Sequence, residues 1–133
     1  MSAGCLFDTS LLIDFEAETA DGVAGPATCA LESLRGQALW LSVVTVPELL
    51  EAADDPVVAA RALGGHRLQT IGWAAAQRCA HHQARTPRRL GENDAWQVAL
   101  AIGGRLTLVG HARAFAGRPG LDYLDHRQIQ PAR

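Results

Sequence analysis

Short apolar segments alternate with longer helical stretches along this chain, and this alternation is the feature that most restricts its fold. The apolar segments are expected to be buried strands at residues 5–7, 38–44, 68–71, 106–109 and 121–124. A helical stretch precedes each of the later strands, which is typical of a parallel sheet covered on both faces. The sequence therefore predicts an α/β protein.

Capping and breaking residues set the expected helix boundaries. Ser10 opens a helix that continues to about Glu18, and Thr45 begins another. Asn93 is expected to cap a helix from Asp94 to Ile102 that Gly103 and Gly104 close. The remaining predicted helices are 26–35, 56–63 and 74–85, with a helical turn at 111–115.

A chain of 133 residues lies in the size range of one domain, so we expect a single domain over residues 1–133. Its apolar residues form runs too short to span a bilayer, and no basic-then-apolar leader begins the sequence. Three separated cysteines without a C-x-x-C pair indicate neither a disulfide framework nor a zinc site. We therefore expect a soluble cytoplasmic protein in a reducing compartment.

The net charge of −2 argues against binding of nucleic acid by bulk positive charge. Any such affinity would come from a local patch. All basic side chains are arginine, which suits bidentate phosphate contacts, although a GC-rich genome explains this usage equally well. The candidate phosphate contacts are Arg85, Arg88, Arg89, Arg113 and Arg118, and a solvated loop is the alternative interpretation.

Three carboxylates stand at boundaries between elements and are the candidate functional residues. Asp8 ends the first strand, Glu48 lies in the first helical turn after the second, and Asp94 opens the helix before the fourth. In open parallel sheets, functional residues gather beyond the carboxyl ends of the strands. We therefore expect these side chains to share one cleft.

Each carboxylate also has a purely structural interpretation. Asp8 can start the following helix, and Thr45 to Glu48 matches a capping box, in which the glutamate returns to the cap. Asp94 at a helix start complements the helix dipole. Only the three together, in this order, indicate a functional site.

Gathering three carboxylates has an electrostatic cost that suggests a metal. At an effective dielectric constant near 20, two carboxylates about 5 Å apart repel by about 3 kcal/mol. Magnesium takes oxygen ligands, usually one or two carboxylates with water and substrate phosphate. A metal-bound water is a better nucleophile toward a phosphodiester. The arrangement therefore suggests phosphodiester hydrolysis.

Several short motifs together carry a resemblance to a known family. They are, in order, LFDTSLLID at 6–14, VVTVPEL at 43–49, DAWQVALA at 94–101, LTLV at 106–109, and the stretch from Phe115 to Leu121. In order and spacing they resemble the PIN domain family and, within it, the VapC-type toxins of bacterial toxin–antitoxin pairs.

The resemblance implies a three-layer α/β/α fold with a central, mainly parallel sheet of four to five strands. It implies an endoribonuclease that uses Mg²⁺ or Mn²⁺, with Asp8, Glu48 and Asp94 as catalytic and metal-binding residues. It further implies an RNA substrate, a homodimer and a cognate antitoxin whose C-terminal segment fills a groove near the acidic site. Leu11, Leu12 and Phe15 are candidates for that groove, and core packing is the alternative.

The chain departs from the family where a fourth acid is usual. After the fourth strand the family carries a hydroxyl residue and then an acid, and here Gly110 and Ala112 occupy those positions. Glu92 and His111 are candidates to compensate, and exposed loop side chains are the alternative. This departure motivates a second hypothesis, a degenerate PIN domain that binds RNA or a protein partner without cleavage.

Overall fold

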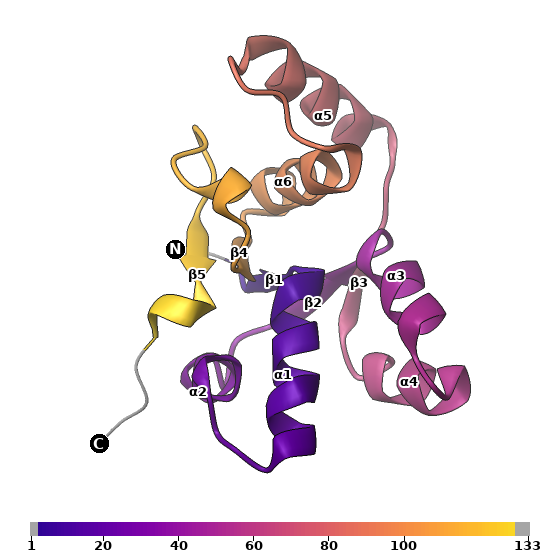
Figure 1. The fold of residues 1–133 in the computed structure, drawn as a ribbon. Coiled ribbons are helices and arrows are strands. Elements are labelled where there is room, and N and C mark those ends of the chain that lie inside the picture. The colour runs from indigo at the N-terminus through magenta and orange to yellow at the C-terminus, as the bar shows by residue number, and fades with distance from the viewer. Residues whose placement is uncertain (1–2, 130–133) are drawn as a thin grey trace.

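A five-stranded parallel sheet forms the centre of the molecule, as a computed structural model describing residues 3–129 shows (Figure 1). Its strands are β1 (Cys5–Phe7), β2 (Leu39–Ser42), β3 (Arg67–Gln69), β4 (Thr107–Gly110) and β5 (Tyr123–Asp125). They lie in the order β3-β2-β1-β4-β5, and every neighbouring pair is parallel. The predicted parallel sheet is confirmed. Residues 1–2 and 130–133 of the expected 1–133 domain lie outside the described residues.

Helices cover both faces of this sheet and complete the three layers that the resemblance implies. The helices are α1 (Thr9–Asp21), α2 (Pro26–Ser33), α3 (Thr45–Ala52), α4 (Pro56–Leu63), α5 (Trp73–Arg85) and α6 (Glu92–Gly104), with 3₁₀ turns η1 (Arg113–Phe115) and η2 (His126–Gln128). Figure 1 shows α5 and α6 on one side of the sheet and α1 and α2 on the other. Between residues 3 and 129, no helix is long and apolar enough to cross a membrane.

The sheet separates two hydrophobic clusters because side chains alternate along each strand. Leu6 and Leu108 point into one cluster with the inner face of α6, whereas Phe7 and Val109 point into the other with α1 and α2. The central strands β1 and β4 are therefore buried on both faces, which explains their continuous apolar sequence.

The sequence places most elements correctly and misses some boundaries. The predicted helix at 56–63 is confirmed as α4, and Asp55 caps it by accepting hydrogen bonds from the backbone N–H groups of Val57 and Val58. The predicted cap at Asn93 is wrong, because α6 begins at Glu92 after Gly91. The glycines expected to close α6 lie inside it.

The helix ends at Arg105, in the left-handed conformation with φ 54°. A Cβ added at Gly103 would stand 2.6 Å from Nη1 of Arg78 on α5. Because this guanidinium ends a flexible, exposed side chain, it could move to make room.

Candidate active site

Asp8 lies at the centre of the carboxyl edge of the sheet. It directly follows β1, whose last residue, Phe7, pairs with Leu41 of β2 and Val109 of β4. Its side chain is 7% exposed. Oδ2 accepts hydrogen bonds from the backbone N–H (3.3 Å) and Oγ (2.6 Å) of Ser10, and so caps α1. Oδ1 faces the other way and accepts from Nε2 of Gln97 on α6 at 3.3 Å.

Glu48 does not form the capping box that its spacing suggests. The N-cap of α3 is Val44, and it has no side-chain cap hydrogen bond. The Glu48 carboxylate instead accepts a hydrogen bond from Oγ1 of Thr9 at 3.0 Å and another from Nδ2 of Asn93 at 2.7 Å. Glu48 therefore faces α1 and α6, toward the other two candidate carboxylates.

Asp94 lies in the first turn of α6, and its electrostatics connect the three acids. Burial raises the pKa of its carboxyl, and the negative charges of Asp8 and Glu48 raise that pKa further. The fold thus places all three predicted carboxylates in one shared electrostatic environment, although their sequence separations are about forty residues.

No protein cation neutralises this group within the described part of the chain. All salt bridges found between residues 3 and 129 involve Asp14, which is not one of the three. Carboxylate oxygens are the ligands that Mg²⁺ and Mn²⁺ prefer. The donor chemistry and the uncompensated charge therefore fit a divalent cation.

The side chains do not form a ready-made cage. Over residues 3–129, no three carboxylate, imidazole or thiolate groups are placed so that they could hold one ion. Magnesium usually takes one or two protein carboxylates and completes its octahedron with water and substrate oxygens. The arrangement fits a site of that open kind.

Several polar neighbours of the acids were missed from the sequence: Thr9, Ser10, Thr45, Asn93 and Gln97. Gln97 is buried, donates to Oγ1 of Thr45 at 2.6 Å, and leaves its own Oε1 without a partner among the described groups. Its position three residues after Asp94 places it on the same helix face and was an available signal. Asn93 gave an ambiguous signal, because its position also suited a helix cap.

Gly110 and Ser10 interlock beside Asp8. A Cβ added at Gly110 would stand 2.8 Å from Cβ of Asp8 and 2.9 Å from Oγ of Ser10. Oγ of Ser10 donates to Asp8 and accepts a hydrogen bond from the backbone N–H of His111 at 3.1 Å. A hydroxyl from the start of α1 thus occupies the space next to residue 110, where the resembling family carries a hydroxyl side chain.

Tyr123 on β5 fixes the stretch that lacks the fourth acid. Its hydroxyl donates to the backbone carbonyls of Gly110 (3.3 Å) and Ala112 (3.2 Å). Burial raises the pKa of this phenol to about 12, with smaller effects from Asp125 and Asp8. Tyr123 therefore stays protonated and acts as a hydrogen-bond donor.

The two candidates for compensation make no hydrogen bond or salt bridge with Asp8, Glu48 or Asp94 among the described residues. The side chain of Glu92 is exposed. Nε2 of His111 lies 3.8 Å from Oδ2 of Asp14, and its backbone N–H donates to Oγ of Ser10 beside Asp8. Compensation by either residue stays a prediction.

Asp14 forms a second polar cluster near η2. Its carboxylate accepts hydrogen bonds from Nε2 of fully buried His126 (2.8 Å) and from Nε (2.9 Å) and Nη2 (3.1 Å) of Arg127. The rings of His126 and His111 meet edge to face. The hydrogen bond from Arg127 is the main cause that lowers the pKa of Asp14 to about 2.

The groove candidates on α1 divide between core and surface. Leu11 is fully buried, so its assignment to an antitoxin groove is wrong and core packing is its role. Leu12 packs partly against the same cluster, and Phe15 is 36% exposed. Of these three side chains, Phe15 is the most accessible to a partner.

The arginine candidates also divide. Arg85, Arg88, Arg89 and Arg113 are exposed. Arg118 instead donates hydrogen bonds to the carbonyl of Ala114, to Oγ1 of Thr86 and to the carbonyl of Arg88, and so ties the loop after α5 to the segment after η1. Its role in this structure is to connect these two segments.

Known proteins match this chain when structures are compared. No protein-family model matches the sequence, and no curated protein sequence matches it. A toxin–antitoxin complex from Klebsiella pneumoniae contains a chain with 27% identity and a TM-score of 0.77, over 94% of this chain and 99% of that one. This chain has the PIN fold of VapC-type toxins.

Further solved structures extend this VapC-type likeness. VapBC2 from Rickettsia felis, bound to a promoter DNA fragment, has a TM-score of 0.72 at 15% identity over 90% of this chain and 96% of that chain. FitAcB from Neisseria gonorrhoeae has a TM-score of 0.72 at 17% identity over 94% and 99% of the two chains. At such identities the likeness describes the fold alone.

Proposed function

We propose that this chain is a metal-dependent endoribonuclease and the toxin of a VapBC-type pair. The observation that carries this proposal is the electrostatic state of Asp94: its pKa is raised by burial and then by the charges of Asp8 and Glu48, and none of these three acids takes part in a salt bridge of the described chain. A functional site keeps such an electrostatic cost when charge is needed there.

Asp8 and Asp94 would hold Mg²⁺ or Mn²⁺, with Glu48 binding the ion or orienting its water, and the ion would supply an activated water and stabilise charge on the phosphodiester. The chain's own polar groups orient the ligands. Gln97 holds one oxygen of Asp8, and Ser10 holds the other. Thr9 and Asn93 supply the same support on either side of Glu48 in the described structure.

Cleavage of RNA by the purified protein tests this proposal. A structured RNA should be cut in the presence of Mg²⁺ or Mn²⁺, and Asp8→Asn should reduce the rate by on the order of 100-fold or more, because several kcal/mol of charge stabilisation depend on the ion. Asp21→Asn, an exposed acid at the far end of α1, is the matched control and should cut normally. Undiminished cutting by pure Asp8→Asn protein would remove the assignment.

An antitoxin partner is the second part of the proposal. Its support is the extent of the likeness to the chain from the Klebsiella pneumoniae complex, which covers nearly all of both chains. We expect the product of a small neighbouring reading frame to co-purify with this chain and to inhibit its cleavage. Because its proposed substrate is RNA, we expect the protein to act in the cytoplasm.

We also propose that the chain forms a homodimer. Large apolar side chains are exposed on α4, on β3, on the connection that follows β3 and at the start of α5: Val57, Val58, Leu68, Ile71 and Trp73. Trp73 is the most exposed of the five, at 79%. Light scattering of the purified chain should give twice the 14.1 kDa mass, and Trp73→Arg should shift it toward the monomer.

A binding protein without cleavage is the alternative function. It is favoured by Ala112, which offers no carboxylate, and by the tight packing of Gly110 against Asp8. A calorimetric titration that detects no binding at millimolar Mg²⁺ or Mn²⁺ would support this alternative. Gain of cleavage in Ala112→Asp would show that one missing acid separates the two functions.

A further inference from the structure

Positive charge is concentrated in one continuous part of the chain. Residues 56–91 contain six arginines and no carboxylate, whereas the rest of the sequence contains six arginines and all fourteen carboxylates. The segment comprises α4, β3, α5 and the loop that leads to α6. A chain of net charge −2 thus carries half of its arginines in a segment without acidic residues.

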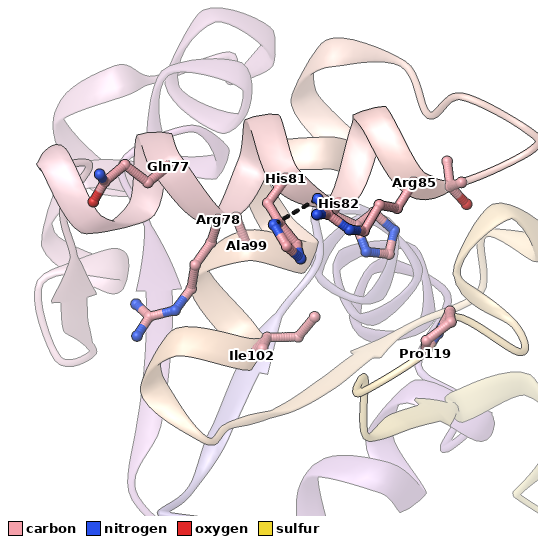
Figure 2. A pocket seen from close by; sticks show the side chains of 9 residues that line it. Gln77, Arg78, His81, His82, Arg85, Ala99, Ile102 and Pro119 are labelled. Atoms are coloured by element: carbon pink, nitrogen blue, oxygen red, sulfur yellow. Dashed lines mark hydrogen bonds between the residues drawn. The ribbon is translucent and has the colours of Figure 1, made fainter.

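A groove of about 470 Å³ lies on this segment (Figure 2). Arg78, His81, His82 and Arg85 line it from α5, and Ala99 and Ile102 contribute an apolar surface from α6. Figure 2 shows the α5 side chains following one side of that helix, above α6. None of the described residues that line the groove is a carboxylate.

The two arginines of the groove are available to an anion. Both are exposed, and within residues 3–129 Arg127 is the one arginine that pairs with a carboxylate. Arg85 donates a hydrogen bond to Nδ1 of His81 at 2.8 Å, which also orients that ring. Arg78 and Arg85 are seven residues apart, or about 10 Å along a helix, so they share a face and can contact successive anionic groups.

His82, which lines the groove, has a ring nitrogen without a hydrogen-bond partner among the described groups. This atom is Nε2, and it is buried. Burial lowers the pKa of this imidazole, and Arg118 and His81 lower it further, so the ring is neutral near pH 7. A neutral ring beside two guanidinium groups can donate a hydrogen bond without adding charge.

The chemistry of the groove favours a sugar–phosphate strand. Guanidinium groups match phosphate oxygens in bidentate geometry, and an apolar surface between them suits the sugar or base of a flexible single strand. The groove also follows α6 away from the candidate active site. Ala99 and Ile102 lie five and eight residues beyond Asp94, which is about 8 and 12 Å along the helix axis.

We propose that the α5–α6 groove binds the backbone of an RNA single strand outside the candidate active site, with Arg78 and Arg85 contacting phosphates. This inference rests on the proposed function, because it makes the strand in the groove a continuation of the RNA that is cut. Its contacts are to phosphate, so the groove would position RNA with little preference for sequence.

Binding measured without cleavage tests the proposal. Fluorescence anisotropy with a labelled single-stranded RNA of mixed sequence, in EDTA, would be followed at several salt concentrations. In Arg78→Gln/Arg85→Gln, the negative slope of log Kobs against log salt should become shallower by about 1.4, because each phosphate contact in a single strand contributes about −0.7. Affinity at low salt should fall at least tenfold.

The control variant removes the same charge elsewhere. Arg35→Gln/Arg61→Gln changes two exposed arginines outside the groove and should change the slope little. An unchanged slope in the groove variant, or an equal fall in both variants, would overturn the proposal, since the second result indicates bulk charge alone. Thermal unfolding of both variants should match the wild type, because the substituted side chains are exposed.

Two further outcomes keep this test separate from the proposed function. RNA binding that depends on Arg78 and Arg85, in a protein that cuts no RNA, would uphold the groove and contradict the nuclease. Cleavage that depends on Asp8, with no effect of the groove variant on binding, would do the reverse. A glutamate-rich peptide that displaces RNA from the groove as well as unlabelled RNA does would identify an acidic protein as the ligand and overturn the RNA proposal.

Discussion

Two groups of acidic residues illustrate opposite treatments of carboxylate charge. Asp14 is surrounded by Arg127, His126 and His111, and its pKa is lowered to about 2. Asp94 is partly buried, and its pKa is raised by this burial and by the charges of Asp8 and Glu48. The first carboxylate stabilises the fold, whereas the second reduces stability unless something from outside the chain balances it.

This difference in surroundings distinguishes a carboxylate with a structural role from one that is a candidate for function. A carboxylate paired with cations contributes to stability over the pH range in which it is charged. A carboxylate gathered with others of like charge has no such role, and sites of this kind are candidates for function. Asp8 belongs to the acidic group and also has a structural contact, since one oxygen caps α1 while the other accepts a hydrogen bond from Gln97 on α6.

Among the substitutions that test this comparison, one in the Asp14 cluster should have the largest effect on stability. We expect Asp14→Asn to lower the free energy of unfolding by about 2 kcal/mol, because charge-assisted hydrogen bonds from Arg127 and buried His126 are lost. Urea denaturation at pH 7 would measure it. An unchanged unfolding midpoint would mean that this cluster does not stabilise the fold.

The pH dependence of stability should follow the same cluster. Because folding lowers the pKa of Asp14 from 3.8 to about 2, its contribution is complete above the unfolded value and is lost as pH falls from about 4 toward 2. The stability difference between wild type and Asp14→Asn should therefore narrow over that range. A difference that stays constant down to pH 2 would contradict the assigned pKa.

Disruption of the close packing between Gly110 and Ser10 should have the next largest effect on stability. Gly110→Ala forces a Cβ to within 3 Å of both Asp8 and Ser10 and should cost about 1.5 kcal/mol of stability. In the double variant with Ser10→Ala the cost should be less than additive, because one of the two close contacts disappears. A strictly additive double-mutant cycle, measured by denaturation, would show that these residues do not interact.

The smallest expected effect has the opposite sign. Asp94→Asn should raise the free energy of unfolding by about 0.5 kcal/mol at pH 7 in EDTA, because it removes one charge from a group of like charges. The loss of a favourable charge at the start of α6 offsets part of this gain. Destabilisation by Asp94→Asn would place Asp94 with Asp14 among the structural carboxylates.

The sequence predicts the sheet and the three carboxylates because both depend on regular patterns. Apolar segments with intervening helices indicate parallel strands, and acids at their carboxyl ends follow from that topology. Interpretation of Glu48 was open, since the capping box is a local pattern and the contacts with Thr9 and Asn93 join residues 39 and 45 positions apart.

Contacts between distant segments explain what the sequence does not predict. Asn93 was expected to cap α6 and instead donates to Glu48. Ser10 approaches Gly110 across about a hundred residues, and Asp14 meets Arg127 across 113. None of these pairs has a periodic signature, so only the packed fold defines them.

Calorimetric titration of the purified chain with Mn²⁺ is the most direct test of the central claim, that the carboxylates at 8, 48 and 94 jointly bind a divalent cation. The wild type should bind with a Kd below about 1 mM, Asp94→Asn at least about tenfold more weakly, and the control Asp21→Asn normally. No binding by the wild type, or equal binding by Asp94→Asn, would contradict the claim.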